Sequence, residues 1–136
     1  MMLPLPLPEF LSAIASRYLD NPYHNYKHGC DVCHTVYRLV RVSGLEAVCS
    51  GVEFFSLLVA AVAHDVGHLG VNNAFLVKSR HALAVRYEDQ SPLEKLHCSL
   101  LTEVIGDLLY LFVCVYVCVC RKLWYYCSVS INYHVG

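Results

Sequence analysis

The chain has 136 residues, enough for one domain with a substantial core and short for a two-domain enzyme. Ten basic and eleven acidic side chains give a formal net charge of −1, and no basic stripe is present, which excludes nucleic acid as a partner. Apolar residues make up 57% of the chain, and the excess lies mostly between Leu108 and Cys127.

The N-terminal residues and the cysteines bear on the cellular compartment. Residues 1–8 lack a charged n-region, and their prolines interrupt any apolar h-region, so we expect no secretory signal. Eight cysteines could form a disulfide framework, but without export reduced thiols are favoured. We therefore expect a cytoplasmic protein, and the sequence does not indicate its oligomeric state.

The first part of the chain predicts three helices. Leucine and proline alternate over residues 3–8, so residues 1–8 predict an extended lead-in that cannot be helical. The first helix is predicted to begin at Glu9 and to end before Asp20-Asn21-Pro22. Its predicted apolar face consists of Phe10, Leu11, Ile14, Tyr18 and Leu19.

A second helix is predicted from Tyr23 to about Val42, with Ser43-Gly44 ending it. A third, from about Val52 to His64, is apolar nearly all round, as is typical of a buried central helix. The core candidates of the second helix are Val32, Val36, Leu39 and Val40.

Residues 67–73 contain two glycines and two asparagines and predict a loop. Short helices are expected at residues 74–77 and 81–85. Ser91 is the predicted N-cap of a last helix, with Pro92 at its first position and Glu94 completing a capping box. The side chains expected on that helix are His97, Leu100, Leu101, Val104 and Ile105.

Residues 9–105 thus predict one all-α domain, whereas residues 106–136 form a tail of different composition. Its valines alternate between Leu111 and Cys120, which predicts an irregular or strand-like segment. The apolar run from Leu108 to Cys120 is short for a membrane span, and Arg121-Lys122 interrupts it. A membrane contact or an aggregation-prone segment stays open as the minor alternative.

Two short blocks carry residues typical of metal sites. The apolar run at residues 60–63 ends in His64-Asp65, and His68 follows four residues after His64. If this run is helical, the two histidines lie on one face, one turn apart. Upstream, His24 and His28 repeat the same spacing.

These blocks resemble the catalytic domain of the class I cyclic nucleotide phosphodiesterases, over about residues 9–105. The order and the separations of three motifs agree with that family. The first motif resembles its YHNxxHAxDV signature, the second its HDxxHxGxxN signature, and the third the segment that follows. In this chain they read Tyr23-His24-Asn25-x-x-His28-x-x-Asp31-Val32, then His64-Asp65-x-x-His68-x-Gly70-x-x-Asn73, then Tyr87-x-Asp89-x-Ser91-x-Leu93-Glu94-x-x-His97.

The resemblance implies an all-helical, metal-dependent enzyme that hydrolyses cyclic AMP or cyclic GMP to the 5′ monophosphate in signal transduction. Two divalent ions, Zn²⁺ and Mg²⁺ or Mn²⁺, would activate the attacking hydroxide. By motif position the ligands are His28, His64 and Asp65, with Asp65 contacting both ions. His24 would be the general acid for the 3′ oxygen, since an unperturbed imidazole titrates near pH 6.5.

The resemblance also implies supporting roles. His68, Asp31 and Glu94 would hold waters and orient ligands around the ions. Tyr23 and Asn73 would line the substrate pocket. His97 matches a family position but could equally support its helix. The histidines expected to be ordinary side chains are His34, His81 and His134.

Departures from the family pattern limit what this chain is expected to do. Gly67, Leu69 and Gly29 replace the usual aspartate, proline and alanine at positions that bind no metal, and Gly29 is a mild helix penalty. The family's remaining metal aspartate, its base-binding glutamine and its aromatic clamp come further downstream, and Asp107 does not match that ligand. We therefore expect a partial domain that is inactive in isolation.

Three alternatives stay open. The chain could be a truncated, catalytically inactive fragment with residual metal binding. It could also be another hydrolase of the His-Asp (HD) type acting on a different phosphoester. Cys30-x-x-Cys33-His34 has the spacing of a c-type haem attachment, but it overlaps the first signature and lacks an export signal, so it ranks last.

Overall fold

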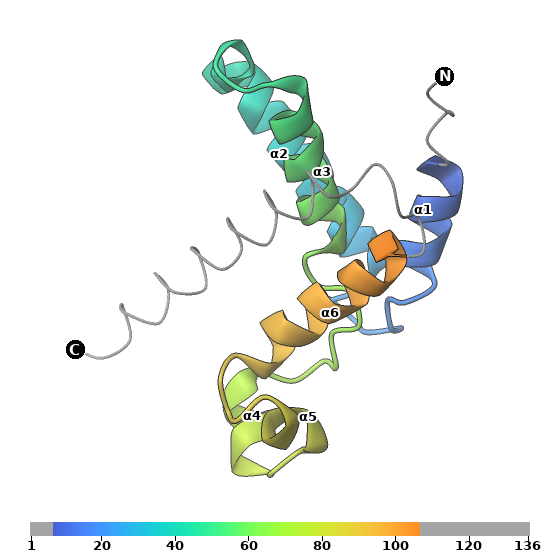
Figure 1. The fold of residues 1–136 in the computed structure, drawn as a ribbon, viewed down its shortest axis with the longest axis vertical. Coiled ribbons are helices and arrows are strands. Elements are labelled where there is room, and N and C mark those ends of the chain that lie inside the picture. Colours follow the sequence, from blue (N-terminus) through green and yellow to red (C-terminus); the bar gives the residue numbers. More distant parts are fainter. Residues whose placement is uncertain (1–6, 107–136) are drawn as a thin grey trace, which may run out of the picture.

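The computed structural model describes residues 7–106, and every regular element within them is helical, which confirms the all-α prediction (Figure 1). No helix in this range is long and apolar enough to cross a membrane. The strand-like tail predicted for residues 106–136 lies outside the described residues from position 107 onward. The elements are α1 (Leu7–Ala15), α2 (Tyr26–Ser43), the 3₁₀ turn η1 (Leu45–Ala47), α3 (Gly51–Ala63), α4 (Asn73–Lys78), α5 (Ala82–Arg86) and α6 (Pro92–Gly106).

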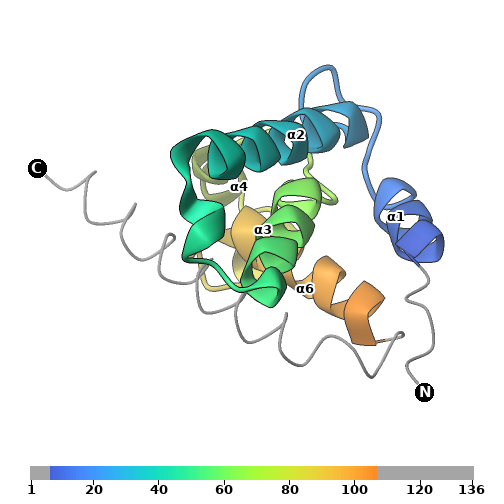
Figure 2. The same ribbon diagram turned by 90° about the horizontal axis from the view of Figure 1, so that it is seen from above.

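The helices are arranged around the C-terminal end of α3. Helices α2 and α3 pack side by side as a hairpin joined through η1, while α4 and α5 lie at the opposite end of the molecule (Figures 1 and 2). Helix α6 contacts α4 and α5 and also contacts α1. This arrangement brings segments from both halves of the described chain to the end of α3.

The main core joins α1, α3 and α6. Phe10 and Ile14 from α1 are fully buried, and full burial of such side chains contributes about 1.5–3 kcal/mol each. A smaller cluster of Leu76, Ala84 and Leu93 holds α4 and α5 against α6. The remaining buried members of the main core are Tyr18, Val59, Val62, Ala63, Val66, Leu101, Val104 and Ile105.

Helix α1 differs from its prediction at both ends. It begins at Leu7 with Pro8 in its first turn. Proline is tolerated there because the N–H group that it lacks would have no acceptor within the helix. It ends at Ala15, because the side chains of Ser16 and Arg17 both donate to the Ala13 carbonyl and compete with the helical bond there. Leu19 is 47% exposed, so its placement on the apolar face was wrong.

Helix α2 begins three residues later than predicted. Asn25 is its N-cap, with φ −119° and ψ 177°, and its side chain accepts a hydrogen bond from the His28 amide. His24 therefore precedes the helix and does not share a helical face with His28. Gly44 ends α2 in the left-handed conformation, as predicted, whereas Leu39 is 63% exposed and is not a core residue.

Helix α3 ends at Ala63, so His64 and His68 are not one helical turn apart. Turns follow, in which the Val66 amide donates to the Ala63 carbonyl and the His68 amide donates to the Asp65 carbonyl. Gly67 permits this path, since its φ is +74° and a Cβ there would lie 2.3 Å from Leu100 Cδ1.

The N-terminus of α6 is capped by a different residue from the one predicted. Ser91 has φ +46°, whereas a capping serine needs an extended backbone. The Leu93 amide donates instead to Asn73 Oδ1 at 3.0 Å, and Asn73 Nδ2 donates to Glu94 Oε2 at 2.9 Å. The short helices α4 and α5 form where predicted, with Asn72 and His81 as their caps.

Candidate metal centre

Three potential ligands meet where α2 passes the end of α3. One donor atom from each of His28, His64 and Asp65 lies within 4.8 Å of the other two. Asp65 Oδ2 is 3.0 Å from His64 Nε2 and 3.4 Å from His28 Nε2. The three side chains are partly buried, with exposed fractions between 15% and 30%. The structure thus brings together all three residues predicted to bind metal.

Close packing of α2 against α3 makes this approach geometrically feasible. Gly29, next to His28, is buried against the last turn of α3. A Cβ at position 29 would lie 2.9 Å from the Val62 carbonyl oxygen and 2.8 Å from the Tyr18 hydroxyl. The sequence predicted only that Gly29 mildly destabilises its helix. In the structure it also has a packing role, because its lack of a side chain lets α2 approach α3.

His64 has a hydrogen-bond acceptor at each ring nitrogen. Nδ1 donates to the Ala61 carbonyl at 2.9 Å, and Nε2 faces Asp65 Oδ2. Burial by itself lowers the pKa of His64, but the hydrogen bonds to Asp65 and Ala61 and the Asp65 charge outweigh it and raise that pKa. The Asp65 carboxylate stabilises a proton at His64 Nε2, and a metal cation bound at this nitrogen would take the place of that proton.

Asp65 has a pKa below its ordinary value. Burial opposes ionisation, but the His64 hydrogen bond and the electrostatic interactions with His64, His97 and His24 outweigh it and lower the pKa. The carboxylate is thus ionised at neutral pH. Its second oxygen, Oδ1, lies 3.9 Å from His97 Nε2, so the group has oxygens facing two directions.

His24 lies beside this group, in the segment before α2. Its ring stacks on His68 with centroids 3.9 Å apart and meets His28 edge-on at 5.9 Å. Asn21 holds the two stacked residues together, since its Nδ2 donates to the His24 carbonyl at 3.1 Å and to the His68 carbonyl at 2.7 Å.

His68 is buried, whereas Tyr23 lies at the exposed edge of the site, beside His28. Burial, followed by the nearby His24 charge, lowers the pKa of His68, and its Nδ1 accepts from the Gly70 amide at 3.0 Å. Tyr23 is 64% exposed, and its ring centroid lies 4.5 Å from that of His28 and 5.0 Å from that of His24.

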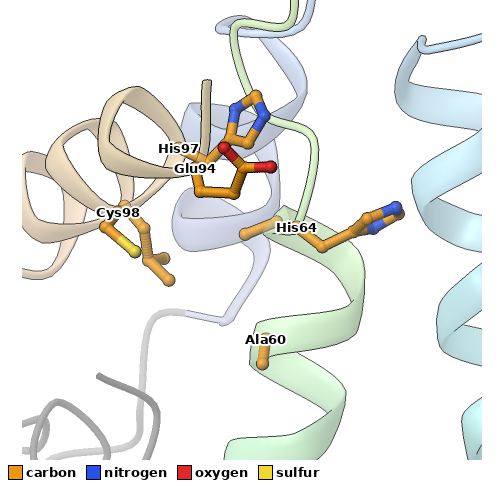
Figure 3. A pocket seen from close by; sticks show the side chains of 7 residues that line it. Ala60, His64, Glu94, His97 and Cys98 are labelled. Carbon is orange, nitrogen blue, oxygen red and sulfur yellow. The ribbon is translucent and has the colours of Figure 1, made fainter. Parts of the chain in front are cut away.

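The other predicted site residues are divided. Glu94 lines a small pocket of about 40 Å³, open to solvent, on the side of His64 where α3 faces α6 (Figure 3). Asn73 contacts Glu94 and caps α6, which gives it a structural role. Asp31 is exposed on α2 and does not belong to the group of three donors. The other residues that line the pocket are Ala60, Ala63, His97, Cys98 and Leu101.

Sequence reasoning left His97 undecided and missed Tyr18 and Asn21. His97 Nδ1 donates to the Val66 carbonyl at 2.7 Å, and burial lowers the pKa of this histidine. The family motif was the signal for His97. Tyr18 and Asn21 carried no comparable signal, since one looked like a core aromatic and the other like a turn residue.

The donor set suits zinc. Two imidazole nitrogens and one carboxylate are common zinc ligands, and three protein ligands with an open position are typical of catalytic zinc sites. The haem alternative gains no support from the described residues, since the group of three donors contains no cysteine.

Comparisons with known proteins agree on one family. Residues 23–113 match the family model described as 3′5′-cyclic nucleotide phosphodiesterase, which extends past the predicted limit at residue 105. The chain is 40% identical over 96 residues to the "cGMP-specific 3′,5′-cyclic phosphodiesterase delta" of Plasmodium falciparum, covering 71% of this chain and 12% of that protein. It is 35% identical over 104 residues to the Homo sapiens "High affinity cGMP-specific 3′,5′-cyclic phosphodiesterase 9A", covering 76% and 18%.

A solved structure gives the same result. The phosphodiesterase domain of the RhoPDE fusion protein from the choanoflagellate Salpingoeca rosetta superposes with a TM-score of 0.72 at 33% identity, covering 96% of this chain and 40% of that one. The chain spans less than a fifth of the length of the two curated relatives above. Because the family model matches more than half of the sequence, this chain belongs to the 3′,5′-cyclic nucleotide phosphodiesterase family.

Proposed function

We propose that this chain carries metal-binding residues of an enzyme that hydrolyses 3′,5′-cyclic nucleotides to 5′ monophosphates in signal transduction. The observation that carries the proposal is the convergence of His28, His64 and Asp65, whose donor atoms lie within 4.8 Å of one another. A cytoplasmic location is part of the proposal, and the described cysteines, which form no disulfide with one another, are in keeping with it.

His28, His64 and Asp65 would bind Zn²⁺, and Asp65 would also reach a second ion, Mg²⁺ or Mn²⁺. When bound, the two ions supply Lewis acidity and lower the pKa of water, so that a nucleophile is available at neutral pH. The support for a bridging role of Asp65 is its ionised state and its two oxygens, one facing His64 and the other facing His97.

His24 would donate the proton to the 3′ oxygen as the phosphate ring opens. Its position beside His28 supports this role, and so does its stacking on a neighbour that burial keeps uncharged. His68 would hold the His24 ring in place without like-charge repulsion. Glu94 would orient water near the ions, with Asn73 positioning it, and Tyr23 would contact substrate at the rim.

Cyclic GMP is the first substrate to test, because the Plasmodium and human relatives are named as cGMP-specific. Cyclic AMP needs an equal trial, since a Drosophila melanogaster relative, 37% identical over 108 residues, is named "3′,5′-cyclic-AMP phosphodiesterase, isoform F".

The test measures metal binding and turnover separately. Purified chain is supplied with Zn²⁺ and Mg²⁺ and assayed on both cyclic nucleotides, with His24→Ala as the catalytic control. Turnover that exceeds this control supports the proposal. Zinc binding without turnover is the result expected of a partial domain that keeps its metal ligands and is inactive in isolation. Activity on a non-cyclic phosphoester alone favours another HD-type hydrolase.

A further inference from the structure

We propose that Tyr18 is a positioning residue of the candidate metal centre, whose hydroxyl holds the Asp65 backbone and thereby aims the carboxylate at His28 and His64. This inference rests on the proposed metal binding by those residues. It assigns to a buried aromatic residue outside the three signature motifs a role in the geometry of the site.

The Tyr18 hydroxyl uses both of its hydrogen-bonding capacities at the end of α3. It donates to the Val62 carbonyl at 3.0 Å and accepts from the Asp65 amide at 3.3 Å. The last carbonyls of a helix lack partners within the helix, so Val62 gains a bond that α3 cannot supply. A phenol can donate and accept at once, and phenylalanine at this position could do neither.

Asp65 needs such a support because it lies beyond the last residue of α3, where helical hydrogen bonds no longer hold the backbone. The Tyr18 ring is 9% exposed and belongs to the main core with Phe10 and Ile14. The packing of the ring in the core therefore fixes the position of the hydroxyl. Burial raises the pKa of Tyr18, so the hydroxyl keeps its proton throughout the physiological range.

The same hydroxyl also touches the helix that carries His28. A Cβ at Gly29 would lie 2.8 Å from the Tyr18 oxygen, closer than real Cβ atoms come to other atoms. The hydroxyl thus occupies the junction between the two segments that supply the ligands, His28 on α2 and His64-Asp65 after α3. A change on either side of this contact should alter how the three donors face one another.

The chain offers a matched control for this hydroxyl. Tyr26 packs against Tyr18 with ring centroids 5.8 Å apart and borders the same core, but its hydroxyl is paired with Cys30 on α2. Tyr18→Phe and Tyr26→Phe each remove one oxygen and keep the ring. Only the first removes a contact to Asp65.

The experiment uses the full chain and zinc alone. Zinc affinity is measured by competition with a chromophoric chelator, and cobalt is substituted at saturation to record its d–d spectrum. Tyr18→Phe should weaken zinc binding about 10- to 100-fold, the usual loss for residues that orient ligands, and should change the cobalt spectrum. Tyr26→Phe should leave both unchanged. Far-UV circular dichroism, recorded well below the melting temperature, checks that each variant is folded.

A second variant reaches the same hydroxyl from the other side. Gly29→Ala places a methyl group against it and should also weaken zinc binding, whereas Gly51→Ala, with no atom within 4 Å of its added Cβ, should not. An added Cβ at position 29 would meet both the Tyr18 hydroxyl and the Val62 carbonyl oxygen. Because the part of the Gly29→Ala effect that acts through the hydroxyl is already lost in Tyr18→Phe, the double variant should lose less than the product of the two single losses.

Two outcomes would overturn the inference. Wild-type zinc affinity with a wild-type cobalt spectrum in Tyr18→Phe would mean that the ring merely packs. If the unsubstituted chain does not bind zinc, the proposed function itself is wrong, and this inference falls with it.

Discussion

At the scale of single residues, the most informative group is His64 with its two acceptors. The Ala61 carbonyl and the Asp65 carboxylate both favour the doubly protonated ring, and together they overcome the effect of burial. Zinc binding requires a neutral imidazole, so the proton that stabilises the metal-free site competes with the metal. Zinc affinity should therefore fall as the pH drops below the raised pKa of His64.

Asp65→Asn tests this coupling in the metal-free chain. Without the carboxylate charge, burial dominates and the pKa of His64 should fall, which NMR titration of the imidazole C–H signals would detect. A His64 titration that does not move in Asp65→Asn would show that the carboxylate does not control it.

The sign of the stability effect follows from the two pKa shifts. A raised His64 pKa stabilises the fold fully below its ordinary value of 6.5, and this contribution is lost as the pH rises through the raised value. A lowered Asp65 pKa stabilises the fold above its ordinary value of 3.8. Asp65→Asn should thus cost more stability near pH 5.5 than near pH 9, as urea unfolding at the two pH values would measure.

At the scale of elements, local end signals decide where the helices begin and end. Gly44 ends α2 with φ +73°, and no atom lies within 4 Å of a Cβ built there. Asn73 joins the start of α4 to the start of α6 through the Leu93 amide and Glu94. These two residues set the hairpin turn after α2 and the direction of α6 past His64.

Replacing Gly44 with alanine should lower the free energy of unfolding by about 1 kcal/mol, because only the left-handed backbone opposes the added methyl group. Gly51→Ala, in the first turn of α3, also meets no atom but has no such strain, so it should be neutral or slightly stabilising. Urea denaturation of both variants gives the comparison. Equal effects would contradict the backbone explanation.

The cap of α6 can be tested by comparing the residue that the sequence suggests with the one that the structure shows. Asn73→Ala removes the acceptor for the Leu93 amide and the donor to Glu94, and should cost about 1–2 kcal/mol. Ser91→Ala should cost less than about 0.5 kcal/mol. Thermal unfolding of each variant is the measurement. A larger loss of stability in Ser91→Ala than in Asn73→Ala would support the capping box predicted at Ser91 and contradict the cap by Asn73.

At the scale of the whole molecule, the candidate site lies between the core and the surface. The end of α3 is anchored by α1 and α6 through the main core, while α2 approaches it from the other side. A metal held by His28, His64 and Asp65 would therefore join α2 to the rest of the fold.

Such a link predicts that zinc stabilises the folded chain. Ligand at 100 times its dissociation constant adds about 2.7 kcal/mol, so the melting temperature should rise with zinc and fall again with a chelator. His64→Ala should abolish this response. His34→Ala, an exposed position on α2 outside the donor group, should retain it. A zinc response that survives in His64→Ala would place the metal elsewhere.

The sequence by itself determined the helical class, most helix positions, the family motifs and the three candidate ligands. Those features depend on residue periodicity and on caps such as Asn25 and Gly44, which act over a few neighbouring positions. The end of α1 and the separation of His24 from α2 were mispredicted, because side chains and turns compete with helix propagation there.

Only the tertiary structure decided which distant residues support the site. Tyr18 reaches Asp65 across 47 positions, and His97 reaches Val66 across 31. No local pattern records such contacts, since they exist only after α1 and α6 have packed on α3. The family motifs thus identify the residues of the candidate chemistry, while the packing of α1, α2 and α6 around α3 sets how those residues face one another.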